Sequence, residues 1–185
     1  MTHAMFRGLS AFPITPADPH GQVDTGALVG LVQRLAAAEV DSIGLLGSTG
    51  TYAYLTRAER RRAVEAAAGC LGGRVPLIVG VGALRTDDAQ DLARDGEAAG
   101  AAGLLLAPVS YTPLTEEEVF EHFAVVAGAT KLPLCIYNNP ATTHFTFSDA
   151  LVEDCAALAS QASAELERRA REAEREPLPG QDTLL

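Results

Sequence analysis

The sequence has little of several features that mark whole classes of protein. No apolar run approaches the ~20 residues that a membrane-spanning helix needs, and the opening residues, MTHAMFRGLS, have no long apolar segment typical of a secretory signal. Basic residues are outnumbered by acidic ones, 14 to 24, which gives a formal net charge of −10. We therefore expect no nucleic-acid partner and no membrane partner.

Cysteine and lysine are also scarce. The three cysteines, Cys70, Cys135 and Cys155, are odd in number and widely spaced, which disfavours a disulfide framework and favours a reduced, cytoplasmic setting. No two of them have metal-ligand spacing with a histidine, so we expect no metal and no cofactor. The fourteen basic residues include a single lysine, Lys131.

Apolar runs and helical patterns alternate along the first 160 residues. The run at 7–15 reads as a short strand ended by a proline-rich turn, and the runs at 42–47, 75–82, 102–108 and 132–139 read as further strands. A helical pattern follows each of them, beginning near Asp24, Thr56, Thr86, Thr115 and Ser148. The alternation predicts an α/β domain with a parallel sheet. Two architectures remain open at this point, a doubly wound sheet and a (β/α)₈ barrel.

Capping signals support three of the predicted helix starts. Asp24 is a plausible N-cap for the first helix. Thr56 with Glu59, and Thr115 with Glu118, have the spacing of a capping box, in which the N-cap hydroxyl and the acid three residues later satisfy each other's backbone N–H.

The composition changes near residue 160. The segment ASAELERRAREAERE, from Ala162, is almost all Ala, Glu and Arg, with a favourable i,i+4 pair in Glu165 and Arg169. We expect a partial barrel domain over 1–160, then a charged helix and a flexible tail over 161–185.

In both architectures ligands bind at the carboxyl ends of the strands. Glycines and hydroxyls there often serve only the backbone or a helix cap. Two tyrosines and a Ser-Thr pair at three strand ends of one sheet nevertheless favour a proton relay beside a carboxylate site. The groups that follow the strands are Gly47-Ser48-Thr49-Gly50, Ser110-Tyr111 and Tyr137-Asn138-Asn139-Pro140.

Residues 7–158 resemble the dihydrodipicolinate synthase and N-acetylneuraminate lyase family, in order and in spacing. The stretches that carry the resemblance are GLSAFPITP, GSTGTYAYLTRAERR, RVPLIVGVG, GAAGLLLAPVSYTPLTEEEVFEHF and LPLCIYNNPATTHFTFS. The resemblance implies a (β/α)₈ barrel, usually tetrameric, and class I aldolase chemistry without a metal. In that chemistry a lysine amine forms a Schiff base with pyruvate or a related 2-oxo acid.

The resemblance also implies a role for each site residue. Ser48 and Tyr137 would belong to a catalytic proton relay, with Tyr111 as its second tyrosine unless Ser110 occupies that position. Thr49, together with Gly47 and Gly50, would bind the carboxylate of the substrate.

Two positions depart from the family pattern in ways that bear on the substrate. Thr51 stands where many members have Glu, and Thr142 stands where true synthases have an arginine that binds the second substrate. These changes favour a sugar-acid-type aldolase or dehydratase at least as much as a synthase.

The Schiff-base lysine of the family has no counterpart here. It would stand at the end of a sixth strand, but that region reads SAELERRARE, and Lys131 precedes the fifth strand instead. We interpret the chain as a C-terminally truncated barrel of about five βα units that is inactive alone. The alternatives are a non-catalytic partner subunit or pseudoenzyme that assembles with a full-length relative, as a homo- or hetero-oligomer, and a gene product without function.

A barrel and a flat sheet make different predictions for the Ser48 and Tyr137 hydroxyls. In a curled sheet the ends of the second and fifth strands converge, so the two oxygens should lie roughly 3 to 5 Å apart. In a flat sheet they should lie well over ~10 Å apart.

Overall fold

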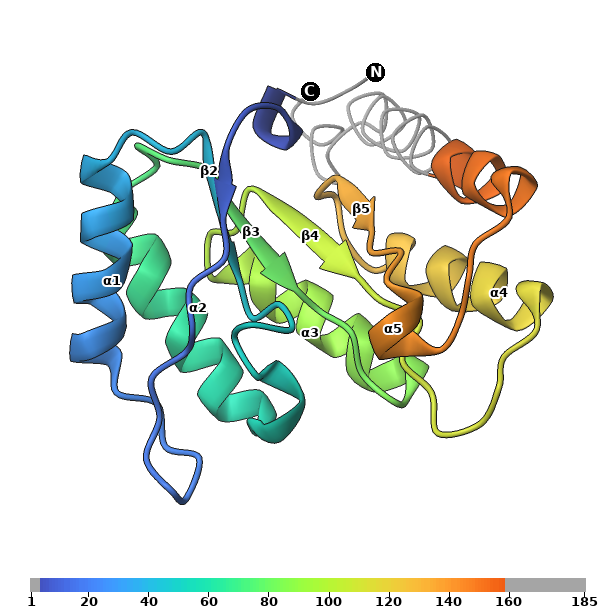
Figure 1. Ribbon diagram of the computed structural model, residues 1–185, viewed down its shortest axis with the longest axis horizontal. Coiled ribbons are helices and arrows are strands. Elements are labelled where there is room, and N and C mark those ends of the chain that lie inside the picture. The colour runs from blue at the N-terminus through green and yellow to red at the C-terminus, as the bar shows by residue number, and fades with distance from the viewer. Residues whose placement is uncertain (1–3, 159–185) are drawn as a thin grey trace, which may run out of the picture.

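The computed structural model describes residues 4–158, which form a parallel five-stranded sheet with helices packed on it (Figure 1). The strands are β1 (Ser10–Ala11), β2 (Ser42–Leu45), β3 (Leu77–Gly80), β4 (Gly103–Leu106) and β5 (Leu134–Ile136). The helices are α1 (Thr25–Ala37), α2 (Arg57–Leu71), α3 (Thr86–Ala98), α4 (Glu116–Ala127) and the short α5 (Pro140–Thr143). Two 3₁₀ turns, η1 (Ala4–Phe6) and η2 (Tyr52–Tyr54), and a helix over 149–158 complete the described part.

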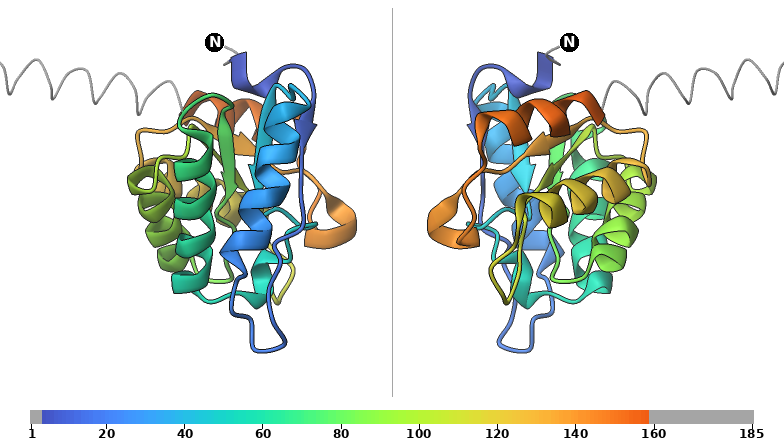
Figure 2. Two further views of the ribbon diagram at one scale, coloured as in Figure 1. Left: turned by 90° about the vertical axis from the view of Figure 1, so that its left-hand side faces the viewer. Right: turned by 90° about the vertical axis from the view of Figure 1, so that its right-hand side faces the viewer.

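The order of the strands decides between the two architectures. Every strand is parallel to its neighbour, and the sheet order is β1-β2-β3-β4-β5, the same as the order in the chain. A doubly wound sheet reverses its strand order at a switch point, and the described sheet has no such reversal. The helices α1, α2 and α3 stand side by side along one side of the sheet (Figure 2). The fold is therefore the first part of a (β/α)₈ barrel, as predicted.

The first strand is much shorter than the run over 7–15 suggested. Only Ser10 and Ala11 pair with β2, opposite Ser42 and Ile43. Pro13 follows almost at once and has no backbone N–H to donate, so the ladder ends there.

All three helices begin directly after the N-cap residues that the capping signals indicated, Asp24, Thr56 and Thr115. The Asp24 carboxylate accepts a hydrogen bond from the Ala27 N–H at 2.9 Å, and Thr115 with Glu118 forms a complete capping box. At the start of α2 the box is only half formed. Thr56 accepts from the Glu59 N–H at 3.3 Å, but the Glu59 carboxylate accepts from the Val23 N–H at 2.7 Å instead of returning to Thr56. Glu59 thus ties α2 to the segment before α1.

An aromatic ring lies over a glycine of β2. A Cβ atom at Gly44 would lie 2.2 Å from the Phe12 ring, and one at Gly47 would lie 3.0 Å from it. Any side chain at Gly44 would therefore displace the ring. Every residue of β2 and β3 is buried, so both faces of these two strands are covered.

The sheet is open at both edges within the described residues. Only β2 pairs with β1 and only β4 pairs with β5. Apolar side chains on the first segment are exposed, with Leu9 at 65% and Ile14 at 57%, and all three residues of β5 are only half-buried. The helix and tail that we expected over 161–185 lie outside the described residues. Within residues 4–158, no helix is long and apolar enough to span a membrane.

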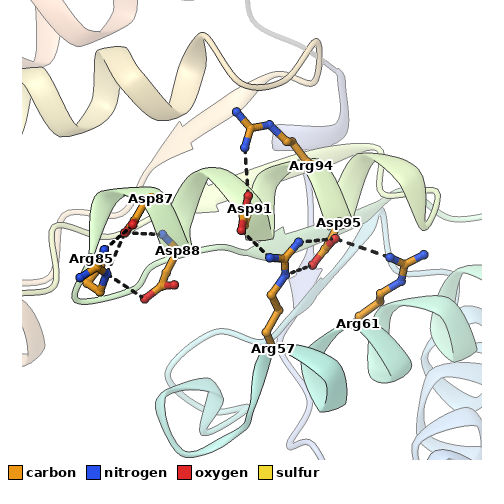
Figure 3. A network of polar contacts seen from close by, with 8 residues as sticks. All are labelled: Arg57, Arg61, Arg85, Asp87, Asp88, Asp91, Arg94 and Asp95. Carbon is orange, nitrogen blue, oxygen red and sulfur yellow. Dashed lines mark hydrogen bonds and ion pairs between the residues drawn. The ribbon is translucent and has the colours of Figure 1, made fainter.

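A network of charges joins α2 to α3 (Figure 3). The Arg57 guanidinium donates two hydrogen bonds to the Asp95 carboxylate, at 2.5 and 3.0 Å, and also pairs with Asp91. Arg61 lies 3.6 Å from Asp95, and Arg94 pairs with Asp91 at 3.0 Å. Asp95 is the most buried member, with 11% of its side chain exposed, and the Arg57 hydrogen bonds lower the pKa of its carboxyl.

We predict that Asp95→Asn lowers the free energy of unfolding by about 1 to 2 kcal/mol at neutral pH, because it removes a charge-assisted bidentate contact. The pKa of Asp95 is lower in the folded chain than in the unfolded one, so its contribution is complete above the unfolded pKa and disappears as the pH falls through the folded one. Urea unfolding of both proteins across this range measures the difference. Asp88→Asn, on an exposed carboxylate, is the control. An equal loss in the control, or a difference that persists in acid, would contradict the prediction.

We also predict that the 185-residue chain self-associates. Open edge strands and exposed apolar side chains such as Leu9 and Ile14 favour pairing with another chain. Size-exclusion chromatography with light scattering measures the mass over a dilution series. A sharp monomer peak together with a cooperative thermal transition would show that the open face is tolerated.

Candidate functional site

The loop after β2 holds its backbone in an uncommon conformation. Leu46 and Thr51 have positive φ angles of 58° and 52°, which bulky and β-branched residues rarely adopt. Between them, the Gly50 N–H donates to the Gly47 carbonyl and the Thr51 N–H donates to the Ser48 carbonyl. These turns place the exposed side chains of Ser48 and Thr49 at the carboxyl edge of the sheet. Strained backbone of this kind is common at ligand sites.

Glycines let this loop pass close to its neighbours. A Cβ atom at Gly80 would lie 2.0 Å from the Leu46 carbonyl oxygen, so no other residue fits at the end of β3. A Cβ atom at Gly50 would lie 3.0 Å from the Thr15 hydroxyl and 3.1 Å from the Leu46 Cα. Packing alone therefore explains Gly50, and also Gly47 beneath Phe12. The substrate-binding role of these two glycines remains a prediction.

Tyr137 reaches this loop from the far edge of the sheet. Its N–H donates to the Leu106 carbonyl at 2.8 Å and extends the pairing of β4 with β5. Its hydroxyl lies 3.1 Å from the Ser48 hydroxyl and accepts a hydrogen bond from the Asn139 side chain at 2.8 Å. The ends of β2 and β5 converge, as expected for a curled sheet and not for a flat one.

The surroundings of Tyr137 favour loss of its proton. The hydrogen bond with Ser48 lowers the pKa of the phenol most, while burial raises it, and hydrogen bonds from Asn139 and Thr142 lower it further. The net result is a pKa below the ordinary value of about 10. A phenol of this kind can give up and recover a proton more readily than a free tyrosine.

A small pocket lies beneath the hydroxyl pair. Its volume is about 10 Å³, close to the smallest space that holds one water. Ser48 and Tyr137 line it together with Tyr52, Gly80 and Gly82. Beside it, the Thr49 side chain is exposed and its backbone N–H has no acceptor among the described residues. That N–H can bind an anion such as a carboxylate.

Two residues that the sequence singled out lie away from this cluster. The Tyr111 side chain is 96% exposed and does not line the pocket. Ser110 accepts a hydrogen bond from the Thr112 N–H and borders a separate cavity of about 510 Å³ beside His122. Lys131 is exposed and precedes β5, so it lies at the opposite end of the strands from Ser48.

Three contributors to the site were not found from the sequence. Asn139 was visible in the Tyr-Asn-Asn-Pro run, and its side chain now proves to bind Tyr137. Tyr52 and Arg60 were part of a quoted motif, but nothing in the pattern indicated that Tyr52 lines this pocket or that Arg60 stacks on its ring. No group of three or more metal-ligating side chains occurs within residues 4–158.

Fold and site together define part of a (β/α)₈ barrel with a hydroxyl cluster at the carboxyl ends of its strands. The chain belongs to the dihydrodipicolinate synthetase family, whose profile matches residues 5–162.

Relatives and solved structures agree with this assignment. The chain is 37% identical over 149 residues to a 4-hydroxy-tetrahydrodipicolinate synthase of Phenylobacterium zucineum, covering 80% of this chain and 50% of that protein. Among solved structures, a dihydrodipicolinate synthase of Agrobacterium tumefaciens is 70% identical, with a TM-score of 0.78 and coverage of 80% of this chain and 50% of that one. A prophage protein of the dihydrodipicolinic acid synthase family from E. coli K12, solved with pyruvate, is 30% identical, with a TM-score of 0.80 and coverage of 85% and 53%. The chain thus spans about half the length of the relatives it matches.

We predict that Ser48→Ala raises the pKa of Tyr137 toward the ordinary value of a tyrosine, because it removes the largest contribution that lowers it. With only four tyrosines in the chain, ¹³C NMR of ζ-labelled tyrosine, assigned by single Phe substitutions, follows each phenol through a pH titration. Asn139→Ala should act in the same direction. The exposed Tyr54 is the internal control. An unchanged Tyr137 titration in Ser48→Ala would show that the contact does not persist in solution.

Proposed function

We propose that the chain carries the 2-oxo-acid-binding half of a lyase or aldolase that acts on pyruvate or a related 2-oxo acid through a Schiff base, in the cytoplasm. The observation that carries the proposal is the 3.1 Å contact between the Ser48 and Tyr137 hydroxyls at the carboxyl edge of the sheet. The pyruvate complex of the E. coli K12 family member supports the choice of ligand class. The three cysteines are free, which is consistent with a reduced compartment.

Each group of the site has a physical role in this proposal. The Thr49 N–H and hydroxyl bind the ligand carboxylate, because an N–H group without an acceptor attracts an anion. Tyr137, held by Ser48 and Asn139, moves a proton to and from the bound acid. The Tyr111 side chain is exposed and does not line the pocket, so no step is assigned to it here.

The 185 residues do not supply the amine that a Schiff base requires. Lys131 is their single lysine and lies at the amino end of β5, whereas barrel active sites lie at the carboxyl end. Arginine cannot replace it, because the guanidinium stays protonated and is not a nucleophile. We therefore infer that these residues alone bind the 2-oxo acid without turning it over.

A second candidate function is a non-catalytic partner subunit that assembles with a full-length relative. The open edges at β1 and β5 favour this reading, because another chain can pair with them and cover Leu9 and Ile14. In either role Thr142, in place of an arginine, disfavours a second substrate with a carboxylate like that of aspartate semialdehyde.

We predict that the 185-residue chain, incubated with pyruvate and borohydride, does not gain the mass of a reduced pyruvyl adduct. Borohydride traps an imine only where a lysine amine reaches the bound acid, and Lys131 does not. Intact-mass spectrometry reads the result, and a full-length relative that carries the lysine is the positive control. A stable adduct on Lys131 would overturn the placement of the site.

Complementation tests the binding half directly. The chain is co-expressed with the C-terminal half of a full-length relative, which supplies the remaining strands and the lysine. We expect the adduct to appear on that lysine, and Tyr137→Phe in this chain to slow its formation. No adduct from a complex that assembles stably would show that this half does not position the 2-oxo acid.

A further inference from the structure

Phe12 is an aromatic residue of the motif GLSAFPITP to which the proposed function gives no role. It follows β1 directly, precedes Pro13 and is 40% exposed. A residue before proline favours extended backbone, so Phe12 continues the line of β1 although only Ser10 and Ala11 pair with β2. Its ring thus lies toward the carboxyl end of the first strand, the end at which barrels bind their ligands.

Two glycines provide the seat of the Phe12 ring. A Cβ atom at Gly44 would lie 2.2, 2.4 and 2.6 Å from carbons of this ring, and one at Gly47 would lie 3.0 and 3.3 Å from it. The ring therefore rests on the backbone of β2 and of the loop that follows it, where no side chain competes for the space. The rest of the ring stays open, as its exposed fraction shows.

The register of the sheet places this ring on the same face as the pocket of the hydroxyl pair. Side chains of paired residues in neighbouring strands point to one face, and so do side chains two residues apart along a strand. Gly44 pairs with Ile78, and Gly80, two residues further on, pairs with Leu105. Gly80 and Leu105 both line the pocket. The Phe12 ring, seated on Gly44, therefore lies on the pocket side of the sheet.

Gly47 connects the ring with the ligand-binding loop. It lines the pocket, and it is followed in the chain by Ser48 and Thr49. The proposed function places the ligand carboxylate at Thr49. In a 2-oxo acid the carbon C3 comes next after the carboxyl and keto groups, so its substituents are the part of the ligand that can reach the open side of the Phe12 ring.

An aromatic ring discriminates between the groups that C3 can carry. A methyl or methylene group packs against the ring and leaves water, which is favourable. A hydroxyl group in the same place loses its hydrogen bonds to water and gains none from the ring, which is costly.

We propose that Phe12 is a specificity-determining residue of the 2-oxo acid site. Its open side contacts C3 of the bound acid and selects acids in which C3 carries hydrogen or alkyl groups instead of a hydroxyl. Pyruvate and the 3-deoxy sugar acids both meet this condition, whereas 3-hydroxy-2-oxo acids do not. This role rests on the proposed function, which supplies the 2-oxo acid.

Two acids that differ in one group test the selection, by isothermal titration of the 185-residue chain. 2-Oxobutanoate carries a methyl group on C3 where hydroxypyruvate carries a hydroxyl. In the wild type we expect 2-oxobutanoate to bind about tenfold more tightly, because a hydroxyl against the ring lacks a partner. In Phe12→Gln, whose amide can pair with the hydroxyl, the ratio of the two affinities should fall to about one. In Phe12→Leu, which stays apolar, the preference should remain.

The ratio separates specificity from stability. A purely structural loss at Phe12 would weaken the binding of both acids alike and leave their ratio unchanged. Leu9→Gln, at a 65% exposed apolar residue of the same segment, is the matched control and should keep the wild-type ratio. A wild-type ratio near one, or an unchanged ratio in Phe12→Gln, overturns the role of Phe12.

The same titration distinguishes the role of Phe12 from the proposed function. If the wild type binds both acids equally well, the 2-oxo acid site stands and only the selection by Phe12 falls. If the wild type binds neither acid, the proposed function fails and the role of Phe12 falls with it.

A direct contact measurement decides the case in which Phe12→Gln fails to fold by circular dichroism. We expect a nuclear Overhauser effect between the methyl protons of bound 2-oxobutanoate and the Phe12 ring of the wild-type chain. The chain has six phenylalanines, and Phe12→Leu identifies the signals of this one. A bound acid that shows no such contact overturns the proposal.

Discussion

The close approach of two backbones, at Leu46 and Gly80, is the contact on which the site depends. The Leu46 carbonyl lies where a side chain on Gly80 would be, so the loop after β2 bends inward across the end of β3. Because it bends there, Ser48 comes within hydrogen-bond distance of Tyr137, three strands away. Leu46 adopts a positive φ at this bend, and such strain persists only where surrounding packing enforces it. The complete burial of Leu46 provides that packing.

The architecture was predictable because it rests on local patterns. Buried parallel strands read as short apolar runs, and Thr115 with Glu118 marks a helix start from side chains only three residues apart. Contacts between distant segments were not predictable in this way. Glu59 has the spacing of a capping box, but its carboxylate accepts a hydrogen bond from the Val23 N–H, 36 residues away. The fold brings this N–H to the carboxylate, where it competes with the Thr56 N–H. The extent of β1 was likewise overestimated, because a proline-rich turn shows that the strand is short but not that only Ser10 and Ala11 pair.

The same distinction divides the candidate site. Ser48, Thr49 and Tyr137 follow strands directly, so the topology fixes which edge of the sheet they occupy. Tyr111 also follows a strand, but a loop of several residues separates it from β4, and its side chain is exposed to solvent. Arg60 was hidden for another reason. A helix rich in arginine reads as a solvated surface, and only the coordinates distinguish the exposed, acid-paired Arg57 from the buried Arg60.

Arg57 and Arg60 show which structural roles arginine can fill in a chain with a single lysine, and which chemical role it cannot. Arg57 presents a planar fork that matches the Asp95 carboxylate in two hydrogen bonds, and this joins α2 to α3. Arg60 uses the same fork on the Gly80 and Gly82 carbonyls, and its guanidinium stacks on the Tyr52 ring. Both roles require a guanidinium that stays protonated, and that property is what disqualifies arginine as the nucleophile of a Schiff base. Under the proposed function, the first five βα units would therefore supply the groups that bind the 2-oxo acid, whereas none of their arginines could serve as the reacting amine.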